Sequence, residues 1–199
     1  MAPESAPLSV TLRRVILAVA LANLGFFGIE VSVALAIRSV SLFADSVDFL
    51  EDTSVNLLIL FALGWSLRAR ARLGFALSLI LLAPALGMLW ALWGKFAAPS
   101  VPAAAPLTLT GLGALAVNFG CAVALARVRD HAGSISRAAF LSARNDVFAN
   151  LGIIAAGFVT AWTASLWPDV LVGLAIAAMN LDAAREVWEA AREEHASAP

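Results

Sequence analysis

Three aspartates interrupt a long apolar stretch at residues 39–64. Asp45, Asp48 and Asp52 follow one another at steps of three and four, so they share one face of a helix. Asn56, four residues further on, prolongs the same stripe. A charged side chain near the centre of a bilayer costs roughly 2.5–3.5 kcal/mol on insertion scales, so three of them need a compensating partner. The simplest such partner is a cation.

A second group of polar residues lies in a later apolar segment. Ser142, Asp146 and Asn150 follow at steps of four and share one helical face. If the two helices meet, Asp48, Asp52 and Asp146 converge, and Ser142 is the nearest candidate for a fourth position. Oxygen ligands of this kind suit hard or borderline divalent cations. In the alternative interpretation, Asp146 pairs with an arginine or a backbone carbonyl group and serves structure alone.

The composition indicates an all-α integral membrane protein. Of the 199 residues, 61% are hydrophobic and only 14% are charged, and the mean hydropathy is +0.88. A soluble domain of this length carries about 25% charged residues. The formal net charge of -1 points to no particular partner, and we expect none among nucleic acids. The single cysteine, Cys121, excludes an internal disulfide and a cysteine-rich metal site, and we expect it to be a small packing residue.

Enzymatic activity is not expected. The only two histidines, His131 and His195, lie outside the apolar segments, and no nucleophile–base pair can be assembled around them. We therefore predict neither a catalytic site nor a prosthetic group.

Six apolar segments each approach the roughly 20 residues that an α-helix needs to cross a bilayer. They cover residues 15–37, 42–67, 73–96, 107–125, 138–162 and 170–182, and the sixth continues as a charged amphipathic tail. We expect a single six-helix transmembrane domain at residues 13–190. A cytosolic N-terminal tail at residues 1–12 precedes it, and a short cytosolic C-terminal tail at residues 191–199 follows it.

The distribution of basic residues predicts that both termini are cytoplasmic. One side of the membrane would carry Arg13, Arg14, Arg68, Arg70, Arg72, Arg127, Arg129, Arg137, Arg185 and Arg192. The opposite side would hold only Arg38 and Lys95, and arginine-rich and lysine-rich loops stay in the cytoplasm. Four tryptophans lie near the outer helix ends, as in an aromatic belt: Trp90, Trp93, Trp162 and Trp167.

Three further polar residues lie inside the apolar segments. Glu30 is costly to bury, and it either lines an outer cavity or sits near the membrane interface. Asn118 and Asn180 are expected to form hydrogen bonds between helices.

The stretch SLFADSVDFLED resembles the second-helix signature of the cation diffusion facilitators. In that signature, a small apolar run and an aspartate precede an H/D-x-x-x-D pair. Asp45 corresponds to the leading aspartate, and Asp48 and Asp52 correspond to the metal-binding pair. The segment around Asp146 and Asn150 resembles the family's H/D-x-x-x-D helix, in which a serine or asparagine follows the second aspartate by four residues.

This resemblance implies a transporter that exports divalent metals from the cytoplasm in exchange for protons, by alternating access and as a homodimer. It places the ion in a tetrahedral site between helices two and five. Asp48, Asp52 and Asp146 would then be ligands, and Asp45 and Asn150 would lie behind them. Ser142 stands where the family usually has histidine or aspartate, so it would be a weak fourth ligand.

The residues and the resemblance leave the identity of the transported metal open. Zinc is the first choice because the family favours it, and cadmium, cobalt and manganese tolerate an oxygen-only site. The chain ends after WEAAREEHASAP, so we expect a short form without the family's C-terminal cytoplasmic domain. We expect a multi-pass protein of a cell membrane, the bacterial inner membrane.

Two other functions remain as alternatives. The chain would be a transport-incompetent membrane subunit that partners another exporter if Ser142 marks a lost ligand. It would be a proton-coupled small-molecule exporter if the carboxylates serve an organic cargo, although such proteins usually carry one essential carboxylate in an aromatic pocket.

Overall fold

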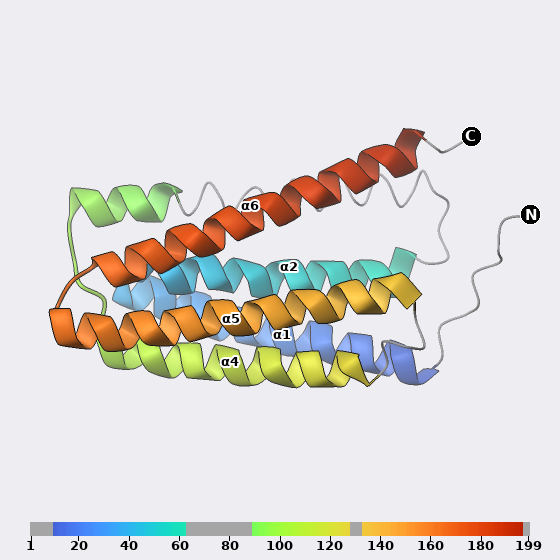
Figure 1. Cartoon of the computed structure of the whole chain (residues 1–199), viewed down its shortest axis with the longest axis horizontal. Helices are drawn as coiled ribbons and strands as arrows, with labels where there is room; N and C mark the ends of the chain where they lie inside the picture. The colour runs from blue at the N-terminus through green and yellow to red at the C-terminus, as the bar shows by residue number, and fades with distance from the viewer. Residues whose placement is uncertain (1–9, 63–88, 128–132, 197–199) are drawn as a thin grey trace, which may run out of the picture.

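The computed structural model describes residues 10–62, 89–127 and 133–196 (Figure 1). Within these ranges all regular secondary structure is helical. The helices are α1 (Val10–Ile37), α2 (Val40–Ala62), α4 (Ala104–Ala126), α5 (Gly133–Thr163) and α6 (Trp167–Ala196), and residues 89–97 are also helical. The predicted all-α class is therefore confirmed.

Three of the described helical stretches are long and apolar enough to cross a membrane: Val10–Ile37, Ala104–Ala126 and Asp146–Thr163. The helix α2 has 23 residues, but it carries four carboxylates among them. Most of the third segment expected from the sequence falls at residues outside the described ranges. That six segments cross the membrane therefore stays a prediction.

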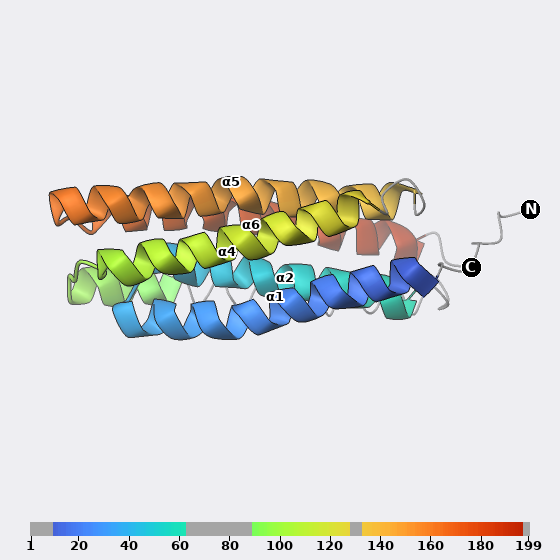
Figure 2. The ribbon, with the colours of Figure 1, turned by 90° about the horizontal axis from the view of Figure 1, so that it is seen from below.

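The helices α1, α2, α4 and α5 run alongside one another, and α6 crosses them obliquely (Figures 1 and 2). Adjacent helices along the chain pack together as α1 with α2, α4 with α5, and α5 with α6. The helix α2 also contacts α5 and α6. Together with a smaller contact to α4, α2 therefore lies beside four other helices, and its polar stripe can be enclosed by protein on more than one side.

The helix bounds agree with the apolar segments where both are known. The helix α1 ends at Ile37 as expected, and α4 and α5 extend the fourth and fifth segments by a few residues at most at each end. The helix α6 begins at Trp167, so Pro168 lies in its first turn, where a missing N–H group costs nothing. It then continues without a break through the charged tail to Ala196.

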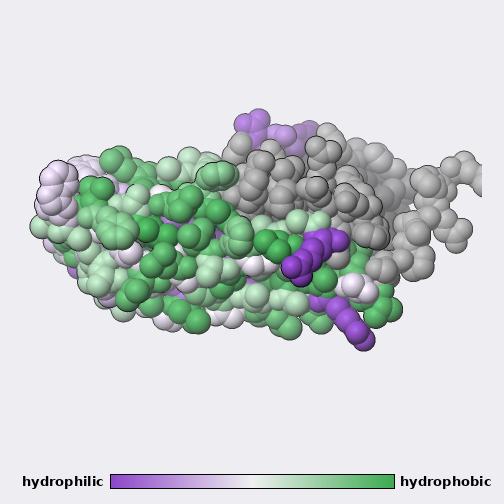
Figure 3. Space-filling model, turned by 60° about the horizontal axis from the view of Figure 1, so that its bottom comes forward, coloured by the Kyte–Doolittle hydropathy of each residue, from purple (hydrophilic) through white to green (hydrophobic). Residues whose placement is uncertain are grey.

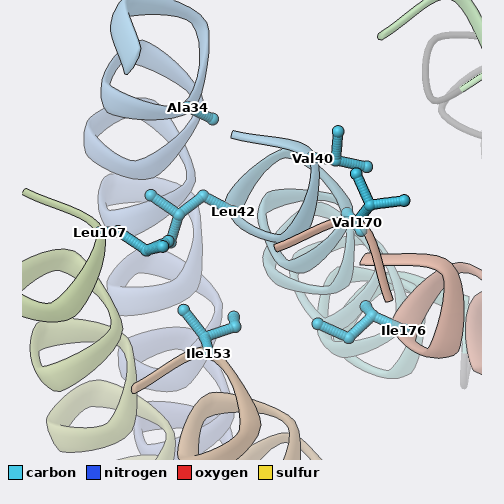
Figure 4. Packing of buried hydrophobic residues seen from close by; sticks show 8 residues of the cluster. Ala34, Val40, Leu42, Leu107, Ile153, Val170 and Ile176 are labelled. Atoms are coloured by element: carbon cyan, nitrogen blue, oxygen red, sulfur yellow. The ribbon is translucent and has the colours of Figure 1, made fainter. Parts of the chain in front are cut away.

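Apolar side chains form the core of the bundle and also much of its surface. One buried cluster brings together residues from α1, α2, α4, α5 and α6: Ala34, Val40, Leu42, Ala44, Leu107, Ile153, Val170 and Ile176 (Figure 4). The face drawn in Figure 3 is mainly hydrophobic, and hydrophilic side chains gather toward one end. Leu21 and Phe148, among others, are largely exposed. A surface of this kind is suited to lipid rather than water.

The start of α2 is held by one buried carboxylate of α6. Asp169 accepts hydrogen bonds from the Ser39 and Ser41 hydroxyl groups, at 2.6 and 2.7 Å. It also accepts them from the backbone N–H groups of Val40 and Ser41, at 2.9 and 3.0 Å. Free N–H groups and the positive end of a helix dipole both favour an anion there. Asp169 therefore caps α2 and joins it to α6.

The same carboxylate has a cationic partner. Lys95 Nζ lies 3.4 Å from Asp169 Oδ2 as an ion pair, and it donates a 2.6 Å hydrogen bond to the backbone carbonyl of Arg38. Both Lys95 and Asp169 are fully buried. At Gly173 the helices are so close that a Cβ atom would lie 2.8 Å from Val40. This end of α2 is therefore tightly fixed.

Candidate metal centre

Asp45 is the first of the predicted site residues on α2, and it is completely buried. Its Oδ2 accepts a 2.7 Å hydrogen bond from Asn150 Nδ2 on α5. Asn150 in turn accepts a 3.0 Å hydrogen bond at Oδ1 from Asn118 Nδ2 on α4. The expected interhelical hydrogen bond of Asn118 is thus confirmed, whereas the side chain of Asn180 lies outside the described residues. Three helices are joined through Asn150.

Asp52 lies two turns further along α2 and is 9% exposed. Its Oδ2 accepts a 3.2 Å hydrogen bond from Asn23 Nδ2 on α1, and Cys121 Sγ on α4 lies 3.6 Å from Asn23 Oδ1. Asn56, at the end of the stripe, bonds through Nδ2 to the backbone carbonyl of Asp52 at 2.7 Å. Cys121 is buried, as expected for a packing residue.

Asp48 and Asp146 complete the predicted carboxylates. Asp48 is half-buried, and Asp146 on α5 is 9% exposed. Asp48 lies within electrostatic range of Asp146, Asp45, Glu51 and Asp52, and Asp146 lies within range of Asp52. The structure therefore brings the polar stripes of α2 and α5 to the same region of the bundle.

The described side chains do not form a preformed metal-binding site. No three His, Cys, Asp or Glu residues among them are grouped closely enough to hold one ion together. The Ser142 position belongs to α5, but its side chain is outside the described residues. The ligand set of Asp48, Asp52, Asp146 and Ser142 therefore stays a prediction.

A cavity of about 340 Å³ lies elsewhere, near the beginning of α2. Its lining includes Arg38, Phe43, Trp90 and Lys95 and none of the aspartates. The cavity is separate from the carboxylates and is not part of the predicted metal site.

The sequence did not reveal the partners of two polar groups near these carboxylates. Nothing in the sequence pattern linked Asn23 of the first segment to the carboxylates, yet its Nδ2 donates a hydrogen bond to Asp52. Glu30 was expected only to line an outer cavity or to sit near the membrane interface, and it is completely buried within reach of Asp45. A carboxylate or amide in the middle of an apolar helix was the signal available in both cases.

A family model for the cation efflux transmembrane domain matches residues 16–193. The match covers most of the 199 residues and includes every helix that carries the carboxylates. The chain belongs to the cation efflux family, the cation diffusion facilitators.

Membership in the cation efflux family establishes the general function. The family consists of membrane transporters of metal cations and is not a class of enzymes. The resemblance drawn from the two aspartate motifs is therefore confirmed at the level of the family. Among curated proteins, none matches the chain.

Proposed function

We propose that the chain exports divalent metal cations from the cytoplasm in exchange for protons, with zinc as the first choice. The observation that carries this proposal is the hydrogen bond between Asp45 on α2 and Asn150 on α5, which sets the polar stripes of these two helices against each other inside a cation efflux domain. Carboxylates buried in a membrane protein need positive charge. Because the family transports metal cations, the cargo is the natural source of that charge.

In the proposed site, Asp48, Asp52 and Asp146 bind the ion and Ser142 supplies a weak fourth oxygen. Asp45 and Asn150 lie behind these ligands and fix the distance between α2 and α5 through their hydrogen bond. Cadmium, cobalt and manganese are further candidate cargoes because an oxygen-only site does not select strongly for zinc.

The proposed cycle is alternating access. Metal binds the carboxylates from the cytoplasm, the site opens outward, and protons replace the metal there. The exchange avoids leaving several negative charges buried without a partner. Proton binding and metal binding therefore exclude one another.

The proposed topology is one domain at residues 13–190, with six spans and both termini in the cytoplasm. The start of α1 and the end of α6 lie at the same end of the bundle (Figure 1). The exposed basic residues Arg13, Arg14 and Arg192 belong to those helix ends, which supports a cytoplasmic location under the positive-inside rule. The bacterial inner membrane is the proposed location.

We also propose that the protein works as a homodimer, as the family resemblance implies. The exposed apolar faces of the bundle offer surface for a second copy. Cross-linking in native membranes tests this point, and a product limited to the monomer at every expression level would refute it.

The function is tested with purified protein in proteoliposomes. Uptake of zinc, cadmium, cobalt and manganese is measured under an imposed proton gradient for the wild type, Asp146→Asn and Glu189→Gln. Glu189 is an exposed carboxylate on α6 and provides the matched control. We expect uptake by the wild type and the control but not by Asp146→Asn.

The other outcomes separate the alternatives. Folded wild type that transports no metal alone would support the transport-incompetent subunit. Proton-driven movement of an organic cation without metal would support the small-molecule exporter. Wild-type metal uptake by Asp146→Asn would refute the assigned site.

A further inference from the structure

Glu30 on α1 is a fully buried carboxyl group that the proposed metal site does not use. Its exposed fraction is 0%. Neither Oε1 nor Oε2 receives a hydrogen bond from any group in the described part of the chain. A buried charged oxygen without a donor is strongly unfavourable. The contact that Glu30 does make therefore decides the protonation state of its carboxyl group.

That contact is with the carboxyl group of Asp45 on α2. The two side chains lie within hydrogen-bonding distance of each other. Asp45 Oδ2 is occupied by Asn150, and Asp45 Oδ1 has no donor among the described residues. Three oxygen atoms of the pair therefore lack a donor unless the pair supplies one itself.

A proton supplies that donor. Two carboxylates are acceptors only, whereas a carboxylic acid donates one O–H bond to a carboxylate. Two like charges in contact in a buried site also cannot both stay ionised, and a single shared proton removes this repulsion. The geometry of Glu30 and Asp45 is thus that of an acid and a carboxylate sharing one proton.

The surroundings contain no described cation that would replace the proton. The charged groups facing the pair are Asp48 on α2 and Asp146 on α5, and both are negative when ionised. From α4, Asn118 reaches the pair through Asn150 and carries no charge. Lys95 is bound to Asp169 at the start of α2.

The pair is placed next to the metal carboxylates without being part of them. Asp45 lies one helical turn before Asp48. It is therefore closer to the end of α2 that would face outward in the proposed topology. A proton entering from outside would therefore meet the pair before the metal site. The arrival of a dication at Asp48 raises the local positive charge and favours release of a nearby proton.

We propose that Glu30 and Asp45 form a proton-binding site separate from the metal ligands, and that this site carries a proton exchanged during metal transport. The inference rests on the proposed proton-coupled function. When metal binds, the shared proton leaves as a hydrogen ion and the pair becomes two carboxylates beside the dication. When the metal leaves outward, one proton returns and restores the acid–carboxylate pair.

The test compares the wild type with Glu30→Gln, which keeps the size of the side chain and can donate to Asp45 without a titrating proton. Proton release is measured by titrating zinc into weakly buffered protein. Infrared difference spectra with and without zinc report the carbonyl band of a protonated carboxyl group. We expect about one proton fewer per bound zinc in Glu30→Gln and a loss of that band. Zinc should still bind, whereas a proton gradient should drive less uptake than in the wild type.

A second variant protects the test from a failure to fold. Asp45→Asn removes the other carboxyl group and should lower the number of released protons in the same way, and Glu189→Gln should leave it unchanged. Wild type that releases protons, with Glu30→Gln and Asp45→Asn releasing equally many, would overturn the proton pair but leave proton coupling intact. Wild type that binds zinc without releasing any proton would instead refute the coupling in the proposed function, and the pair with it.

Discussion

Asn150 on α5 donates a 2.7 Å hydrogen bond from Nδ2 to Asp45 Oδ2 on α2. Both side chains are completely buried. The bond joins the two helices whose carboxylates define the proposed metal site, and Asn118 extends it to α4. The relative position of α2 and α5 at this depth is therefore set by one amide group.

The first prediction concerns the stability that this amide provides. Asn150→Ala removes the donor of Asp45 and the acceptor of Asn118 together, whereas Asn118→Ala removes only the outer bond. A buried group left without its partner costs about 1–3 kcal/mol, so Asn150→Ala should lower the free energy of unfolding by more than Asn118→Ala does. Denaturant unfolding in detergent micelles measures both values. Equal losses in the two variants would mean that the bond to Asp45 contributes little.

The second prediction concerns the buried pair that fixes the start of α2. Asp169→Ala leaves Lys95 and four donor groups at or just before the start of α2 without their acceptor. Breaking such a pair costs about 3–5 kcal/mol. Lys95→Met should cost less, because Asp169 keeps its four donors. The same unfolding measurement ranks the two variants.

The control for this ranking is the exposed pair Arg185–Glu189 on α6, with an N–O distance of 2.9 Å. A solvent-exposed pair of this spacing contributes about 0.3–0.5 kcal/mol, so Arg185→Ala should change stability little. If Lys95→Met proved more harmful than Asp169→Ala, the capping role assigned to Asp169 would be wrong.

The third prediction concerns metal selectivity. Ser142→His adds a neutral nitrogen ligand one helical turn before Asp146. Nitrogen suits zinc more than manganese, so the ratio of zinc to manganese affinity should rise. Competition titrations on wild type and variant give this ratio, and circular dichroism confirms that the variant is folded. A ratio that stays constant or falls in folded protein would show that residue 142 does not face the ion.

The sequence predicted the helices well because length and apolarity alone determine where a chain can cross a bilayer. The carboxyl-terminal ends of α1 at Ile37 and of α4 at Ala126 illustrate this, since an arginine follows each of them directly. Periodicity also placed Asp45 and Asn150 on polar stripes of two helices, but only the family resemblance put both behind the metal ligands, and their hydrogen bond to each other was not predicted.

The sequence did not predict which partners the polar groups choose. Asp169 follows a proline at the start of α6 and is separated by 129 residues from Val40, to which it bonds. Lys95 was expected to be an ordinary basic residue of the outer side, and it is buried against Asp169. Contacts of this kind depend on how helices pack in three dimensions, and neither periodicity nor composition contains that information.

The most direct measurement of the central claim is the binding of zinc to purified protein by isothermal titration calorimetry. The account predicts that Asp48→Asn, Asp52→Asn and Asp146→Asn each lower zinc affinity at least tenfold. Each substitution removes one of the negative charges that neutralise the bound dication. Glu189→Gln should bind as the wild type does. Unchanged zinc affinity in all three aspartate variants would contradict the account, because the ion would then be held by other residues.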